Sequence, residues 1–562
     1  MANSQLNGDI YSHLLSFVSS SSDLVAISQA NKELLDLTEP ELLYRSIRCK
    51  LEDNAVWEHL ISSPAHASRV RELTIEGENG RFPPKFTPYD DESTNALSSF
   101  RNLDATTEPL TNSFKHTRQT TEHSEHLLIQ ALTSMVNLES FTWDRSQVPL
   151  IHEGEEMSRL PAAADDRDAV PDTYIYREDI WTVLRDYTQL RRLKVVDQGR
   201  VGSAYTDSRP IFNSTMFTLR NLTHLDFQTT FDESPESGHV SDEDSDGEDL
   251  HATVEVLRLR DLLSRCPNIE SLSLHLTSYA TYSISSFTDI TPILSTAHWP
   301  QVKSLKLKNI FMRSRTMADF LRAHSSLQTL SAILEFSDQA PFNLQGYEYE
   351  IRGILPRLED VDLPASALRP LLRVMGRPSS LRRISYLEPC DWGANGCQFE
   401  RDDSYVALLD DVWGSPTEEE PNGLPNLLRG LTNLTSLTTR RVATFSQLRR
   451  LIKSTPNLQY IHLDRGSLTL EKNPHSQLLS YLAHWPKLAA YEGEYFWPPE
   501  EELELNSERT LSIVRESITI CPNLREVLWQ DDRPVKFVLQ EDGKLTLEHD
   551  TKFDYIRASD YH

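Results

Sequence analysis

The amino-acid sequence predicts an α/β fold arranged as a solenoid, in which a strand and a helix are repeated along an elongated body. A short phrase, Leu-x-x-Leu-x-Leu after a helix-like stretch, recurs about twelve times between Val70 and Trp529. Most neighbouring copies begin about 23–36 residues apart, and units of that period bury their apolar faces against one another. The clearest copies begin at Asn268, Gln301, Arg357, Asn433, Asn457 and Asn523.

Each copy of the phrase combines a strand signal with a stop signal for the preceding helix. The leucines alternate with polar residues, and alternate side chains of a strand point to opposite faces. A proline stands at the start of several copies, such as Pro267, Pro456 and Pro522, where it ends the helix and extends the chain. We therefore expect a leucine-rich-repeat-like solenoid over residues 53–530, with strands on the concave side and helices outside.

Polar insertions rich in Pro, Ser, Thr and charge interrupt this pattern, and they are typical of long loops. They cover about residues 77–124, 144–173, 232–249 and 390–425. In the third insertion, Ser241 and Ser245 precede acidic residues by three positions. That spacing suits phosphorylation by an acidophilic kinase, and the alternative is a solvated, unmodified insertion.

The two ends of the chain differ from the repeats. Residues 1–52 carry apolar residues at near-helical spacing, which predicts a small all-α module of three or four short helices. We expect the last of these to start at Thr38-Glu39-Pro40, because proline suits the first turn of a helix. Residues 531–562 contain two alternating segments, 535–540 and 545–549, on either side of Asp542-Gly543. Asp-Gly between alternating segments is typical of a β-hairpin, and we expect this hairpin to cap the last repeat.

Composition limits the classes of partner. The chain has 562 residues and a net charge of −28, which argues against general binding to nucleic acid or to an anionic membrane surface. No apolar run approaches the length of a membrane span, and the N-terminus lacks the pattern of a signal peptide. Five cysteines are too sparse for a disulfide framework. We therefore expect a cytoplasmic and/or nuclear protein.

Catalytic and metal-binding motifs are missing from fitting contexts. No nucleophile elbow, phosphate-binding loop or zinc-protease motif is found where the predicted elements would support it. Cys390 and Cys397 lie further apart than the usual zinc pair, and no second pair is near. The sequence therefore predicts a non-catalytic protein with no cofactor and no metal site.

The N-terminal segment resembles an F-box. The resemblance rests on Leu6-Asn-Gly-Asp-Ile10, Leu14-Leu15, Asp23-Leu24 and Pro40-Glu-Leu-Leu43. With the repeats behind it, the chain is similar to fungal-type F-box proteins with leucine-rich repeats. Membership of this family implies a role as the substrate receptor of a Skp–cullin–F-box ubiquitin ligase. By that resemblance the partners would be a Skp-type adaptor and its cullin complex, and the residues that contact the adaptor would include Leu6, Ile10, Leu14, Leu15, Leu24, Ile27, Pro40 and Leu43.

A second hypothesis comes from another functional class. Asn7 stands where the family has proline, so the chain could also be a ligase-independent scaffold or regulatory protein that uses the repeats alone. In both hypotheses a protein substrate or partner would bind the residues between the leucines, which face the concave side. The candidate substrate-binding residues are Arg192, Lys194, His275, Lys306, Lys308, Arg383, Arg440, Tyr460 and His462. Among them we expect two basic clusters, Lys306 with Lys308 and Arg383 with Arg440. The alternative is an ordinary solvated strand face.

Overall fold

The computed structural model divides the chain into two compact units, Met1–Gln301 and Val302–His562. The residues described are 15, 18, 21–30, 32–77, 123–144, 180–197, 211, 214–231, 254–278, 288–334, 341–344, 346–347, 352–375, 380–386, 424–439, 445–463, 474–493, 496–497, 503–529, 533–540 and 544–549.

The first unit contains a parallel sheet whose strands follow the order of the chain. They are β1 (Ser46–Lys50), β2 (Glu72–Glu76), β3 (Ser140–Asp144), β4 (Arg192–Asp197), β5 (His224–Phe231) and β6 (Ser271–Ser278). Neighbours pair in parallel, so that Leu73, Phe141 and Leu193 occupy one register row. All three are buried, which is the result expected when each repeat packs its leucine position against the next.

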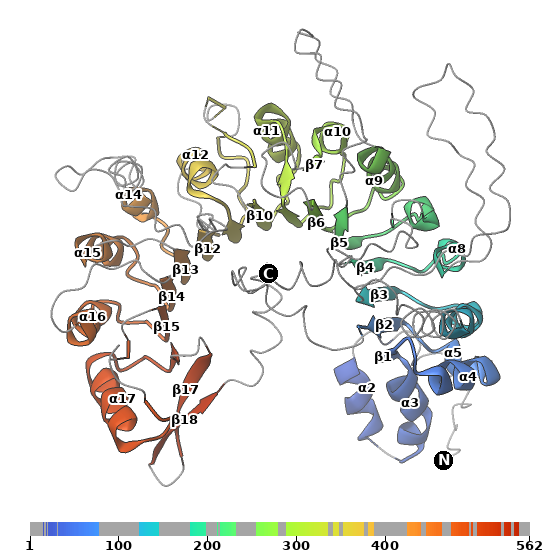
Figure 1. The fold of residues 1–562 in the computed structure, drawn as a ribbon, viewed down its shortest axis with the longest axis horizontal. Helices are drawn as coiled ribbons and strands as arrows, with labels where there is room; N and C mark the ends of the chain where they lie inside the picture. Colours follow the sequence, from blue (N-terminus) through green and yellow to red (C-terminus); the bar gives the residue numbers. More distant parts are fainter. Residues whose placement is uncertain are drawn as a thin grey trace, which may run out of the picture. The chain divides into compact units, whose positions relative to one another are not determined.

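The helices of the first unit lie on one side of its strands, except for the first two, which lie beyond the end strand β1 (Figure 1). They are α2 (Ser21–Ser28), α3 (Lys32–Tyr44), α4 (Asn54–Ser62), α5 (Pro64–Ala67), α8 (Ile180–Arg185), the short 3-10 helix η2 (Thr215–Thr218), α9 (Val254–Ser264) and α10 (Thr291–Leu294). A further helix covers residues 123–134, and β7 (Thr288–Asp289) is a short strand. Helix and strand alternate because parallel neighbours need a crossover.

The second unit repeats the arrangement and then changes direction. Its parallel strands are β8 (Ser304–Lys308), β10 (Thr329–Ile333), β11 (Asp360–Asp362), β12 (Arg383–Tyr386), β13 (Ser436–Thr439), β14 (Tyr460–Leu463), β15 (Ala490–Gly493) and β16 (Glu526–Leu528). A short strand β9 (Ile310–Phe311) follows β8. β17 (Pro534–Leu539) runs antiparallel to β16, and β18 (Leu545–His549) antiparallel to β17.

The helices of the second unit again lie on one side of its strands (Figure 1). They are α11 (Ser314–Ala323), α12 (Ala365–Met375), α14 (Leu424–Leu428), α15 (Phe445–Ser454), α16 (Pro474–Leu482) and α17 (Glu508–Ile520). Burial alternates along the strands as predicted: Leu305 and Leu307 are buried, whereas Lys306 between them is exposed. The core of each unit therefore lies between the strands and their helices.

The α/β class predicted from the repeat is confirmed, and the segments predicted as a hairpin are strands β17 and β18. The N-terminal segment differs in two details. Residues 46–50, inside the range expected to be helical, form strand β1, because Ile47 and Cys49 alternate with polar residues and pair with β2. Helix α3 also continues through Pro40, where a separate helix was expected to start.

The predicted insertions fall almost wholly outside the described residues. Within the described part of the chain, no helix combines the length and the apolarity needed to cross a bilayer.

Candidate functional site

The two N-terminal helices expose large apolar side chains. Val25 on α2 is 42% exposed, and Leu35 and Leu43 on α3 are 44% and 64% exposed. We call these three residues the α2–α3 surface. On a helix, positions 35, 39 and 43 lie on neighbouring turns of one side. The other side of α3 buries Thr38 and Glu41, so the helix has a packed side and a solvent side on which Leu35 and Leu43 flank the exposed Glu39.

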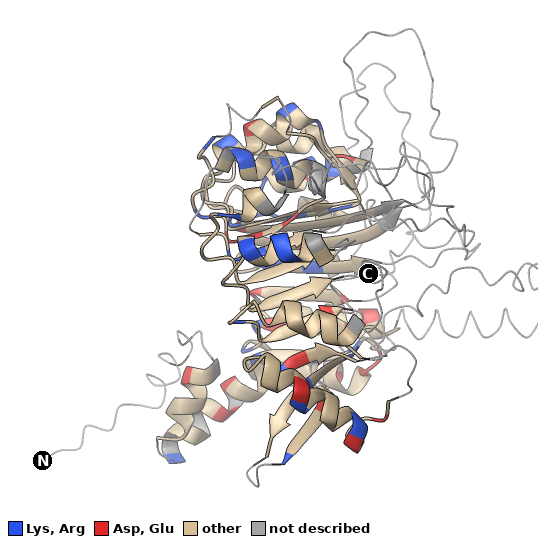
Figure 2. Cartoon of the chain, turned by 90° about the vertical axis from the view of Figure 1, so that its left-hand side faces the viewer, with Lys and Arg blue, Asp and Glu red and all other residues tan. Residues whose placement is uncertain are grey.

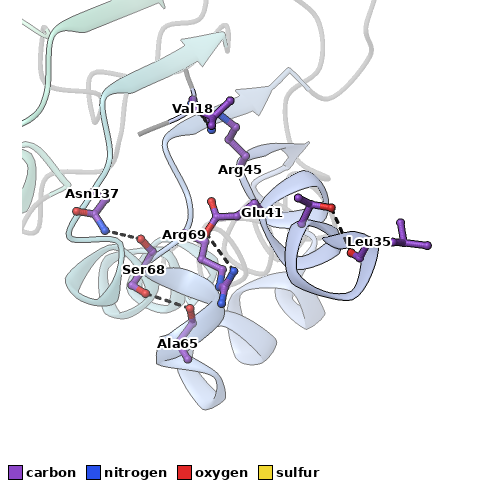
Figure 3. Close-up of polar contacts among 9 residues, drawn as sticks. Val18, Leu35, Glu41, Arg45, Ala65, Ser68, Arg69 and Asn137 are labelled. Carbon is purple, nitrogen blue, oxygen red and sulfur yellow. Dashed lines mark hydrogen bonds and ion pairs between the residues drawn. The ribbon is translucent and has the colours of Figure 1, made fainter. Parts of the chain in front are cut away.

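Polar contacts fix these helices to the rest of the first unit (Figure 3). Arg69 Nη1 donates to Glu41 Oε1 at 3.0 Å, and the Glu41 side chain is only 9% exposed. Arg45, which follows α3, donates from Nη1 to the Val18 carbonyl at 2.7 Å. Further along, Asn137 Nδ2 donates to the Ser68 carbonyl at 2.8 Å. The orientation of α3 is therefore set by contacts with residues distant in the sequence.

The predicted adaptor-binding residues fall into three groups. Leu15 and Leu24 are buried, and their side chains pack in the core of the chain. Leu43 is exposed, as a contact residue must be, and Ile27 is half-buried. Leu6, Ile10, Leu14 and the side chain of Pro40 lie outside the described residues.

Sequence reasoning missed Val25 and Leu35 on this surface. The signal was available for Leu35, because it precedes Leu43 by eight residues, about two helical turns, if residues 32–44 form one helix. The expected break before Pro40 hid that relationship. Thr38 is the local feature that accompanies the unbroken helix: its Oγ1 donates to the carbonyls of Leu34 and Leu35 at 2.8 Å and 3.2 Å.

The second candidate surface is the strand face, which consists of the residues between the buried leucines. In the first unit, Arg192 forms an ion pair with Glu72, and Lys194 Nζ lies 4.0 Å from Asp144 Oδ2. His275 is half-buried on β6. The predicted cations of this unit are thus on the surface. Two of them, Arg192 and Lys194, lie next to carboxylates that partly neutralise their positive charge.

In the second unit the strand face carries the remaining predicted residues. Lys306 is exposed and Lys308 half-buried on β8. Arg383 Nε lies 3.7 Å from Asp360 Oδ1 on the neighbouring strand. Arg440 lies outside the described residues. The predicted pairing of Arg383 with Arg440 as a basic cluster is therefore untested, and Arg383 has an acidic neighbour.

A polar cluster joins β14 to β15 on this face. The Tyr460 hydroxyl donates to Glu492 Oε2 at 2.7 Å, and His462 Nδ1 lies 3.0 Å from the same oxygen. His462 and Glu492 are register partners. Because a carboxylate offers only acceptor sites, both neighbours donate to it. Glu492 has no exposed surface, so one buried carboxylate fixes the orientation of two predicted binding residues.

Sequence reasoning missed Glu492. The weak signal was that β15 departs from the leucine phrase, with Tyr491 in the apolar position and Glu492 beside it. Chemically, the cluster presents an oriented phenol and imidazole that suit recognition of polar groups. In the described part of the chain, no group of three or more His, Cys, Asp or Glu side chains could hold a metal ion.

Comparison with known proteins adds no assignment: no family model matches the sequence, and no curated protein matches it either. The function is therefore argued from the two surfaces alone.

Proposed function

We propose that the chain is a non-catalytic substrate adaptor of a Skp–cullin–F-box type ubiquitin ligase. In this proposal the N-terminal helices are an F-box-like module that docks a Skp-type adaptor. The strands and helices that follow are an irregular leucine-rich-repeat solenoid whose strand face binds a protein substrate. The rate effect is proximity, because a tethered substrate has a high effective concentration at the conjugating enzyme.

The observation that carries the proposal is the α2–α3 surface. Three of the six large hydrophobic side chains exposed among the described residues are Val25, Leu35 and Leu43. Large apolar side chains exposed on a helix are typical of a groove-binding element. The Arg69–Glu41 ion pair also holds the module against the rest of the first unit, so an adaptor bound to the module would have a fixed orientation relative to the strand face of that unit.

The size of the effect can be estimated. Burying one leucine side chain contributes about 1.5–3 kcal/mol, and about 1.4 kcal/mol changes an affinity tenfold. Replacing Leu43 with aspartate therefore weakens adaptor binding at least about tenfold, since a buried charge adds a desolvation cost. Leu43 is 64% exposed in the free chain, so the substitution leaves folding intact.

The test is co-purification of the full chain with a Skp-type adaptor. Leu43→Asp and Val25→Asp are expected to lose the adaptor. The matched control is Leu539→Asp, which makes the same substitution at an exposed leucine on β17, outside the N-terminal helices. This variant is expected to retain the adaptor. A wild-type chain that captures no adaptor would instead support the ligase-independent scaffold.

A further inference from the structure

The outward side of helices α12, α14 and α15 in the second unit carries basic residues without acidic ones. Helix α14 contacts both of the others. Residues 365–375, 424–429 and 445–454 contain no Asp or Glu. Figure 2 looks from the side on which Figure 1 draws α14 and α15, and blue residues outnumber red ones on its upper helices. We call this set the basic helix surface: Arg369, Arg373, Arg429, Arg449, Arg450 and Lys453.

The apolar pattern of these helices directs the cations outward. Helix α15 buries Leu448, Leu451 and Ile452 against the core. Arg449 and Lys453 are four residues apart, so they lie on the same side of the helix, and both are exposed. Helix α12 repeats the arrangement, since it buries Leu368, Leu371 and Leu372 while Arg373 is exposed. The surface is thus a consequence of packing and faces away from the strands.

None of the six cations has an ion pair within the described part of the chain. The neighbouring helix α11 shows the contrast. There Arg315 Nε lies 3.1 Å from Asp319 Oδ2, and Arg322 contacts the same carboxylate at 2.5 Å. Asp319 therefore offsets the charge of α11, whereas α12 and α15 have no equivalent residue.

Arg369 adds an independent observation. It is half-buried, and its Nε and Nη2 atoms are buried without a hydrogen-bond acceptor among the described groups. Desolvating a guanidinium without acceptors is unfavourable. No acceptor among the described groups offsets this cost, and an anion bound at α12 would lower the energy of the positive charge. The chain has 84 acidic and 56 basic residues, so a surface with six positive charges has the opposite sign to the net charge of the protein.

We propose that the basic helix surface binds an acidic segment of a partner protein. Arginine guanidiniums bind carboxylates in a bidentate way, and cations on three helices suit an extended acidic chain. The net charge of −28 repels duplex nucleic acid and anionic membranes, which are large polyanions, more strongly than it repels a short acidic segment. The described residues of this surface also expose no large hydrophobic side chain that could insert into a bilayer or stack on bases.

This proposal does not depend on ligase coupling. The basic helix surface lies on the helix side of the second unit, whereas the proposed adaptor-binding and substrate-binding surfaces are the α2–α3 surface and the strand face. Loss of acidic-segment binding would leave adaptor capture through Leu43 unchanged, so the two proposals fail separately.

The experiment measures binding of a short fluorescein-labelled Asp/Glu-rich peptide to the full chain by fluorescence anisotropy at low salt. The double variant Arg449→Glu with Lys453→Glu is expected to weaken binding at least about tenfold. A second double variant, Arg449→Gln with Lys453→Gln, is expected to give an intermediate loss. The matched control is Arg315→Glu with Arg322→Glu on α11, which makes the same change in net charge and is expected to shift affinity only about two- to threefold.

Circular dichroism and the urea midpoint verify that each variant is folded. The proposal is overturned if the wild-type chain does not bind the peptide, or if the α11 control loses as much affinity as the α15 variant. It is also overturned if labelled duplex DNA or phosphatidylserine vesicles bind through Arg449 and Lys453 and the acidic peptide fails to compete.

Discussion

His462 Nδ1 lies 3.0 Å from Oε2 of Glu492, a carboxylate with no exposed surface on the adjacent strand. Tyr460 donates to the same oxygen at 2.7 Å. This contact holds a phenol and an imidazole in one arrangement before any partner arrives. Such preorganisation lowers the entropy cost of binding, which is why we regard the cluster as the most structured part of the strand face.

Replacing Glu492 with alanine is expected to lower the free energy of unfolding by about 2–4 kcal/mol, because two donors lose a buried acceptor. Glu492→Gln is expected to cost less, since the amide oxygen can still accept from Tyr460. Urea unfolding of both variants checks the order. An alanine variant as stable as the wild type would contradict the stabilising role of the cluster.

Gly493, next to Glu492, marks a close approach between β14 and β15. A Cβ at this position would lie 2.6 Å from the Tyr491 hydroxyl oxygen and 2.9 Å from the Leu463 carbonyl oxygen. Gly493→Ala is therefore expected to lower the free energy of unfolding by about 1–3 kcal/mol. Adding Tyr491→Phe removes only the first clash, so the double variant should show partial relief. Full additivity of the two substitutions would show that the hydroxyl clash is not the cause.

The leucine phrase was enough to predict the strands but not the contacts between them. Ile461 and Leu463 were predicted inward from their own local pattern, and both are buried. The role of Glu492 was not predicted, because its contacts come from the neighbouring strand. Its partner His462 lies 30 residues earlier in the sequence. The same limit applies to α3, where the carboxylate of Glu41 meets Arg69, 28 residues later.

The Arg69–Glu41 pair gives a test of how the N-terminal helices are held. Arg69→Ala would leave a nearly buried carboxylate without its cation, so a loss of about 2 kcal/mol in unfolding free energy is expected. The control is Arg515→Ala, whose partner Glu508 is exposed; exposed pairs contribute about 0–1 kcal/mol. Equal losses in urea unfolding would show that burial of Glu41 does not matter.

Because three thiols are buried, we expect the free energy of unfolding to fall at alkaline pH. Burial raises the pKa of Cys49 from 9.0 to about 12, with a smaller contribution from the charge of Asp53. Burial also raises the pKa of the Cys266 and Cys521 thiols to about 11. The folded chain keeps these protons where the unfolded chain releases them. The stabilisation is thus complete below pH 9 and is lost as the pH rises through about 11 to 12.

The corresponding measurement is urea unfolding over this pH range, in which Cys266→Ala should flatten the decline relative to the wild type. Alkylation at neutral pH should also leave these three thiols unmodified until denaturant is added, since the thiolate is the reactive form. Rapid alkylation of Cys266 in the folded chain would contradict its burial.

The last prediction concerns substrate choice on the strand face. Lys306 is exposed on β8, and Arg383 is exposed on β12 with Asp360 as its neighbour. Lys306→Glu should change captured partners more than Arg383→Glu, because the charge of Arg383 is already partly offset by Asp360. Proximity labelling with each variant measures the change, and Arg322→Glu on α11 controls for net charge. Unchanged partners in both strand-face variants would mean that recognition lies elsewhere on the chain.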